Sequence, residues 1–272
     1  MKIEKYNQRL LAVLGTVGVI FLIVALLSFI SIMIIDYFRF NDDIETGILS
    51  DDKIEELQKK NKREQVISYE NPRLIDTLNS IYIIPISHKT LNKEEDIDKV
   101  VGLLSTSNNY EPSDTRYSSG YYGAFNNLIV YDSEKGTNEK LFDERVNFDH
   151  IKTEYFEDDI LLLMNVSKKD TYKDGVINLM DFKTLHIYSL SQKQLKTIGI
   201  DGMDVFSYKF LNNSKDLSIR FGIDKNKDGQ YSEYNEPTSI KKYDFENDIL
   251  VDIIDEKINS DLQKTLEGTK NQ

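Results

Sequence analysis

The sequence contains no cysteine and only three histidines in 272 residues. The absence of cysteine excludes a disulfide framework and a zinc site built from thiolates. His88, His150 and His186 stand far apart, and none has a second histidine at the spacing of metal ligands. His186 lies in the alternating segment LHIY, where we expect a half-exposed structural residue and not a catalytic one.

Motifs of known catalytic sites are also missing. Residues 118–123 (SSGYYG) lack the Gly-x-Ser-x-Gly elbow of hydrolases and read as a loop with aromatic contacts. Glycine motifs that cradle phosphate do not occur. With 46 acidic residues in the chain, paired carboxylates single out no site. A non-catalytic role is therefore favoured, and a hydrolase with an unrecognised site is an alternative.

The charge of the chain is unevenly distributed. The formal net charge is −12, but residues 1–35 carry a net +2 from three basic residues and Glu4, so the rest of the chain carries −14. A domain this acidic repels phosphate backbones, so no nucleic acid is expected as a partner, whereas cations are attracted.

Residues 10–35 form an uncharged apolar run of 26 residues, without proline. At 1.5 Å per residue, such a helix spans a hydrocarbon core of roughly 30 Å. No small-x-small cleavage site is evident, so we expect an uncleaved single-pass anchor in the lipid bilayer. Lys2, Lys5 and Arg9 precede the run, which predicts a cytoplasmic N-terminus and an extracytoplasmic C-terminal domain, periplasmic or at the cell surface.

The remaining sequence suggests short helices on either side of a larger domain. Ser50 precedes a segment with acids first and bases last, which suits a solvated stalk helix. Ile258, Leu262 and Leu266 share one helical face, which predicts an amphipathic helix docked on the domain, with Gly268 as its stop. The predicted parts are a cytoplasmic tail (1–9), the membrane helix (10–35), a stalk (36–66), a β-repeat domain (67–256), and a C-terminal helix and tail (257–272).

The domain contains an internal repeat. Segments that start at Phe156 and Phe210 match at an offset of 54, which aligns Leu163 with Leu217 and the loop DTYKDG with DKNKDG. After a one-residue insertion, Tyr188 matches Tyr243. A third, fainter copy aligns Tyr131 with these tyrosines; residues 81–86 supply its preceding strand and residues 87–120 an insertion.

Each copy has β character. Leu217, Ile219, Phe221 and Ile223 alternate as a half-buried strand requires, and turn residues separate the following strands. The run NNSKDLSIRFGID…IKKYDFENDILVDI resembles blades of TolB-like β-propellers, a resemblance that covers residues 120–254. We therefore expect an all-β domain of blade-like antiparallel repeats. Because closed propellers have four or more blades, it could be an open stack, a propeller completed by residues 66–110, or a ring completed by oligomerisation.

The loop at residues 224–236 (DKNKDGQYSEYNE) carries the clearest chemical pattern. Oxygen-bearing side chains at positions 1, 3 and 5, followed by glycine, resemble the first half of an EF-hand calcium loop. Position 12 is Asn235 and not an acid, and Pro237 would stop an exiting helix, so a loop between strands is expected. The predicted ligands are Asp224, Asn226, Asp228, the backbone carbonyl of Gln230, and Glu233 or Glu236.

The equivalent loop at residues 170–181 (DTYKDGVINLMD) is a weaker candidate. Tyr172 replaces the ligand at position 3, while an acid does fall on position 12. Its predicted ligands are Asp170, Asp174, Asn178 and Asp181. The sequence thus predicts a membrane-anchored, calcium-stabilised β-repeat domain that acts as a binding or assembly module. An accessory subunit of a larger membrane complex, with another envelope protein as partner, is the alternative; the oligomeric state stays open.

Overall fold

The computed structural model describes residues 14–28, 47–62, 64–91, 120–212 and 214–268. The chain divides into two compact units, residues 1–46 and residues 47–272.

In the first unit, residues 14–28 are helical and their side chains are exposed. Ser28 donates its hydroxyl to the Val24 carbonyl at 2.9 Å. The rest of the predicted anchor, residues 10–13 and 29–35, and the tail 1–9 lie outside the described residues. None of the helices in the described ranges has the length and apolar character needed to cross a bilayer. The membrane anchor therefore stays a prediction.

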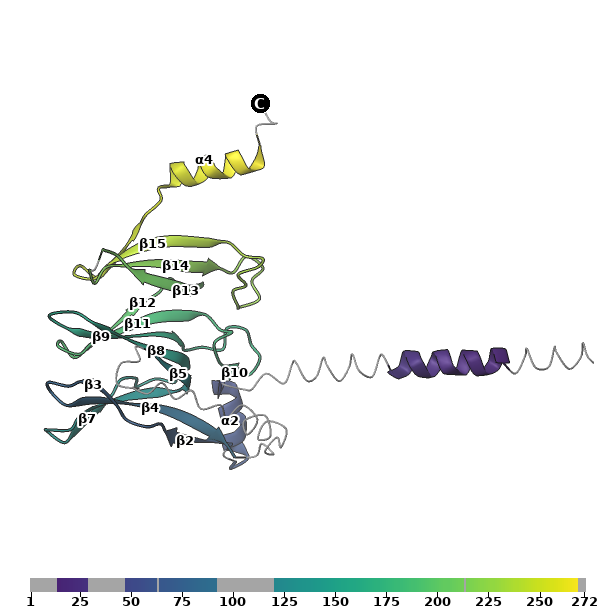
Figure 1. The fold of residues 1–272 in the computed structure, drawn as a ribbon, viewed down its shortest axis with the longest axis horizontal. Helices are drawn as coiled ribbons and strands as arrows, with labels where there is room; N and C mark the ends of the chain where they lie inside the picture. Colours follow the sequence, from purple (N-terminus) through teal and green to yellow (C-terminus); the bar gives the residue numbers. More distant parts are fainter. Residues whose placement is uncertain (1–13, 29–46, 63, 92–119, 213, 269–272) are drawn as a thin grey trace, which may run out of the picture. The chain divides into compact units, whose positions relative to one another are not determined.

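The second unit consists mainly of three antiparallel sheets that lie one over another in Figure 1, which confirms an all-β class. The first sheet has the order β2-β4-β6-β7, with β3 also paired to β4. Its strands are β2 (Gln65–Tyr69), β3 (Arg73–Asp76), β4 (Ile81–Thr90), β6 (Asn127–Asp132) and β7 (Thr137–Lys140). Residues 81–86 do supply the strand that pairs with β6, as the sequence predicted.

The second and third sheets repeat one antiparallel arrangement. The second has the order β12-β11-β9-β8-β5 and the third the order β13-β14-β15-β16. The strands of the second are β5 (Gly120–Phe125), β8 (Phe148–Tyr155), β9 (Ile160–Ser167), β11 (Lys183–Ser189) and β12 (Gln194–Ile198). Those of the third are β13 (Met203–Phe210), β14 (Leu217–Ile223), β15 (Thr238–Asp244) and β16 (Ile249–Asp252).

The turn after each tyrosine-bearing strand has the same hydrogen bond in all three sheets. Asp132, Ser189 and Asp244 each follow the repeat tyrosine and accept the N–H of the residue three positions later, at 3.0, 3.1 and 2.9 Å. A side-chain oxygen that closes its own turn is the reason Asp and Ser favour such positions. The alignment of Tyr131, Tyr188 and Tyr243 therefore corresponds to one structural position.

Two hydrophobic clusters hold the sheets together, and β9 contributes to both. Leu162 and Met164 pack in the cluster between the first and second sheets, while Leu161 and Leu163 pack in the cluster between the second and third. All four side chains are fully buried. Since successive strand residues point to opposite faces, a run of apolar residues is what a sheet covered on both sides requires.

The predicted repeat alignment is wrong by one residue within this strand. Tyr188 pairs with Leu162, and Tyr243 pairs with Leu217, so Leu162 and not Leu163 is equivalent to Leu217. A shift of one residue places a side chain on the opposite face of the sheet. The error arose because β9 is apolar at every central position and offers no alternation to fix the register.

The expected stalk is part of the β unit. After β1 (Ile48–Leu49), helix α2 (Asp51–Lys59) confirms the predicted helix and buries only Leu57. β1 pairs with β10 (Val176–Ile177), and Gln65 bonds to Gly47 and Leu49. β1, α2 and Gln65 thus belong to the compact β unit, whereas the sequence predicted a solvated stalk that ends at residue 66.

Helix α4 (Glu256–Glu267) confirms the predicted C-terminal helix. The Asp255 carboxylate accepts the N–H of Ile258 at 2.8 Å and begins the helix. The predicted docking is not observed, because α4 has no buried residue and Ile258, Leu262 and Leu266 are all exposed.

Candidate calcium loops

Both acidic loops lie at one end of the sheets, on the right in Figure 1. Residues 170–181 lie between β9 and β11, and residues 224–236 between β14 and β15. The two loops therefore occupy equivalent positions in the second and third sheets, as the repeat predicted.

The 224–236 loop is folded around its own carboxylates. Asp224 accepts the N–H of Lys227 at 2.6 Å and that of Gly229 at 3.0 Å. Asn226 Oδ1 accepts the Asp228 N–H at 2.9 Å, and Asp228 accepts the Gln230 N–H at 3.0 Å. This last bond is the main cause that lowers the pKa of Asp228. The oxygens at positions 1, 3 and 5 are thus gathered within one tight turn.

Glu236 closes this loop, and Glu233 is exposed. One oxygen of Glu236 accepts the N–H groups of Lys225 and Asn226 at 2.7 and 3.2 Å. The other accepts the Ser232 N–H at 2.9 Å. The bond from Ser232 is the main cause that lowers the pKa of Glu236. The carboxylate therefore ties the start of the loop to its end.

The 170–181 loop is built in the same way. Asp170 accepts the N–H groups of Asp174 and Gly175 at 3.2 and 3.0 Å. Asp174 accepts the N–H of Val176 and the side-chain amide of Asn178. The first and fifth positions of the two loops thus play matching roles, although Tyr172 replaces the third oxygen.

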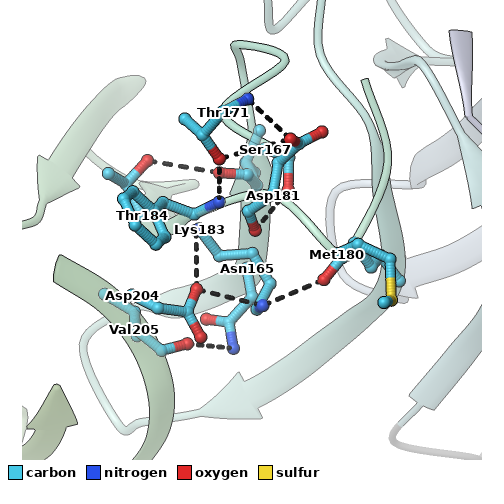
Figure 2. A network of polar contacts seen from close by, with 12 residues as sticks. Asn165, Ser167, Thr171, Met180, Asp181, Lys183, Thr184, Asp204 and Val205 are labelled. Carbon is cyan, nitrogen blue, oxygen red and sulfur yellow. Dashed lines mark hydrogen bonds and ion pairs between the residues drawn. The ribbon is translucent and has the colours of Figure 1, made fainter. Parts of the chain in front are cut away.

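Asp181 closes the 170–181 loop, as Figure 2 shows. It accepts backbone N–H groups from Thr171 at 2.6 Å, Tyr172 at 3.0 Å and Asn178 at 2.9 Å. The side chain is 1% exposed, and this burial raises the pKa of Asp181. A buried acid with several amide donors is stabilised in its charged form by those bonds and destabilised by loss of water.

Asp181 and Glu236 are equivalent, although they occupy positions 12 and 13 of their loops. Each accepts the N–H groups of positions 2 and 3 with one oxygen and that of position 9 with the other. The second loop is one residue longer, and the extra methylene of glutamate covers that difference. The acid that seemed to come one residue late in the sequence therefore has the same role in the structure.

The two loops contact each other across neighbouring sheets. Thr171 donates its hydroxyl to the Gly229 carbonyl at 2.6 Å and accepts the Phe182 N–H at 3.0 Å. Gly229 has a φ of +89°, and a Cβ at this position would lie 1.9 Å from the Thr171 carbonyl oxygen. Only glycine fits, because it tolerates positive φ and has no Cβ.

A buried ion pair that the sequence did not reveal lies beneath the loops (Figure 2). Asp204, at the start of β13, accepts the backbone N–H of Lys183 at 2.7 Å and pairs with its ammonium at 3.0 Å. Asp204 is 2% exposed. The pair joins β11 to β13, and its partners lie 21 residues apart with no local motif to connect them.

The loops offer oxygen atoms of the kind calcium prefers, namely carboxylate, amide and backbone oxygens. Across the described part of the chain, no three histidine, aspartate or glutamate side chains are grouped so that they could hold a metal. The closing acids, Asp181 and Glu236, accept backbone amides. Asp224, Asn226 and Asp228 also accept N–H groups of the loop, but they are less buried than Glu236, so binding in the 224–236 loop would use mainly these three residues.

His186 differs from the sequence prediction because it is fully buried and not half-exposed. It packs edge-on against Phe142, with ring centroids 5.4 Å apart. Burial is the main cause that lowers the pKa of His186 to about 4, and the Lys168 charge adds to it. His186 is therefore a neutral core residue at physiological pH.

The fold and loops define an antiparallel β-sheet protein with a recurrent turn and paired acidic loops. No family model matches the chain, and neither a curated protein nor a solved structure matches it significantly. The resemblances to TolB-like blades and to an EF-hand loop thus stay predictions.

Proposed function

We propose that this chain is a membrane-anchored, extracytoplasmic binding module whose paired acidic loops are stabilised by calcium. The observation that carries the proposal is the matched construction of the two loops, with equivalent closing acids and direct contact through Thr171 and Gly229. A cation in one loop would draw its oxygens together and, through this contact, order the other loop. The anchor is supported by the 26-residue apolar run and its basic N-terminal flank.

The module is further proposed to be an open stack of blade-like sheets, and not a closed ring. What supports this is the outer face of the third sheet, which is polar at its centre and exposes Ile249 and Val251 only on the edge strand β16. Asp216 and Lys242 occupy the positions equivalent to Leu161 and Ile187, and they form an ion pair at 2.6 Å. A repeat with a polar centre on its outer face is suited to end a stack, because an ion pair in place of apolar side chains does not need to be covered.

An accessory subunit of a larger membrane complex is the second candidate. It is favoured by apolar side chains on the outer face of the first sheet. Ile67 and Tyr69 on β2 are 66% and 63% exposed, and Tyr82 pairs with Tyr131 in the neighbouring strands. Exposed apolar patches on soluble domains often mark protein interfaces. Co-purification of the full-length protein from membranes distinguishes the two, since a solitary module would elute alone.

Thermal unfolding of the full-length protein in detergent tests the calcium proposal. Ligands that bind only the folded state raise the melting temperature by mass action. We expect calcium to raise it over chelator, and magnesium at the same concentration to have a smaller effect, because it demands stricter geometry. Equal melting temperatures in calcium and chelator would contradict the proposal.

Protease treatment of intact cells tests the extracytoplasmic location, and we expect cleavage of the C-terminal domain.

A further inference from the structure

A cavity of about 1190 Å³ opens between the first and second sheets. It lies at the end of the sheets opposite the acidic loops, because β9 begins at the cavity with Ile160 and ends next to the 170–181 loop. Its floor includes Ile75, Ile81 and Val130, which belong to the hydrophobic cluster between these sheets. We call it the inter-sheet cleft.

Thr153 places an unsatisfied hydroxyl in the lining of this cleft. The residue is 2% exposed, and its Oγ1 has no hydrogen-bond partner among the residues that the structure describes. Thr153 lies on β8 on the same face as Ile151, which packs toward the first sheet, so its side chain faces the cleft. Buried polar atoms are normally paired, and an unpaired one destabilises the fold because it has lost its bonds to water. A bound ligand with a polar group would supply the missing partner.

The cleft has a net negative charge. Its lining holds seven carboxylates and two lysines. Four of these carboxylates are in ion pairs, namely Asp132 with Lys135, Glu154 with Lys152, and Asp158 and Asp159 with Lys215, and the acids still outnumber these bases. Burial raises the pKa of Tyr188 to about 12, and the charge of Glu139 on β7 adds to this effect. The field of Glu139 therefore reaches into the cleft, where a cation would be attracted.

Aromatic rings and a free strand edge complete the site. Tyr155 lines the cleft with 58% of its surface exposed, and the face of such a ring attracts cations. β7 is the last strand of the first sheet, all four of its residues are exposed, and in the described structure it pairs only with β6. An exposed edge of this kind can hydrogen-bond an extended peptide. The cavity also exceeds the roughly 300–1,000 Å³ typical of small-molecule sites.

We propose that the inter-sheet cleft binds an extended basic peptide, with one basic side chain at Glu139 on β7, a second over the ring of Tyr155 on β8, and a polar group paired with Thr153. This proposal specifies the partner of the binding module and rests on that proposed function. It does not depend on calcium, because the loops lie at the opposite end of the sheets.

Fluorescence polarisation with the full-length protein in detergent tests the proposal. The probe is a labelled, end-capped hexapeptide of alternating lysine and valine. Glu139→Gln should weaken its binding at least fivefold, whereas Glu246→Gln, an equal charge change in the exposed turn after β15, should change it less than twofold. An equal loss of peptide affinity in both variants would show that the peptide is attracted by the overall negative charge, and this would contradict the proposed site. The absence of binding to the wild-type protein would also contradict it.

Two further measurements test the role of the Thr153 hydroxyl and the chemical class of the ligand. Thr153→Val should weaken peptide binding at least threefold without lowering the melting temperature, because it removes an unpaired polar atom. A loss of stability with unchanged binding would contradict this role of the Thr153 hydroxyl.

Spermine should compete weakly with the peptide. Competition by spermine as strong as that of unlabelled peptide would show that the ligand is not specifically a peptide. The rise in melting temperature caused by calcium should persist in Glu139→Gln. A failure of the peptide proposal would therefore not contradict the calcium proposal.

Discussion

The hydroxyl of Thr171 donates a hydrogen bond to the carbonyl of Gly229, at 2.6 Å, and joins the acidic loops of neighbouring sheets. The same contact brings the Thr171 carbonyl so close to Gly229 that no Cβ can be accommodated there. The repeat therefore does more than duplicate a turn, since the 170–181 loop restricts the backbone of the 224–236 loop at Gly229.

Gly229→Ala tests this close approach. Gly202→Ala is the matched control, because Gly202 also has a positive φ of +73° but has no atom within 4 Å of its added Cβ. We expect the control to cost about 1 kcal/mol from backbone strain and Gly229→Ala to cost at least about 2 kcal/mol, since the clash adds to that strain. Urea unfolding of the two variants measures the difference. Equal free energies of unfolding would show that the loops do not touch as described.

Glu236→Asp tests the equivalence of the two closing acids. The shorter side chain cannot span the longer loop, so the bonds to the N–H groups of Lys225 and Ser232 should be lost. We expect Glu236→Asp to lower the urea midpoint nearly as much as Glu236→Ala, although it keeps the charge. Asp181→Glu provides the reciprocal variant, which should also destabilise because the buried site has no room for an added methylene. A wild-type midpoint for Glu236→Asp would contradict the assigned role.

His186 predicts a specific dependence of stability on pH. Its folded pKa is about 4, below the usual value of 6.5, so the unfolded chain takes up the proton first as pH falls. Stability from this residue is complete above pH 6.5 and is lost progressively between pH 6.5 and 4, by about 3 kcal/mol. The free energy of unfolding of His186→Leu should fall less steeply than that of the wild type in this window. Parallel pH profiles would refute the neutral, buried assignment.

Part of the fold follows directly from local sequence. The repeat tyrosines and the oxygen-bearing residue after each of them mark the same strand end in every sheet, because turn chemistry is short-range. The register of β9 could not be read in this way, since a strand buried on both faces has no polar alternation. The exposed state of α4 was also missed, because an apolar helical face indicates that a surface could be buried and not which surface buries it.

In the candidate sites as well, features within one loop were predictable from the sequence, whereas contacts between sheets were not. Asp170, Asp224 and their glycines were predictable, because spacing within one loop fixes their geometry. The contact of Thr171 with Gly229 and the pair of Lys183 with Asp204 come from packing between sheets. Thr153 was equally invisible, since a single threonine in a strand gives no sign that its hydroxyl lacks a partner.

Calcium titration of the full-length protein in detergent, followed by calorimetry, tests the central proposal most directly. We expect saturable binding in the wild type, carried mainly by the 224–236 loop. Asp224→Asn combined with Asp228→Asn should abolish most of the heat, while Asp170→Asn should reduce it less, because its loop has Tyr172 in place of an oxygen ligand. Binding that persists unchanged in the double variant, or a wild type that releases no binding heat and retains no calcium on dialysis, would contradict the account.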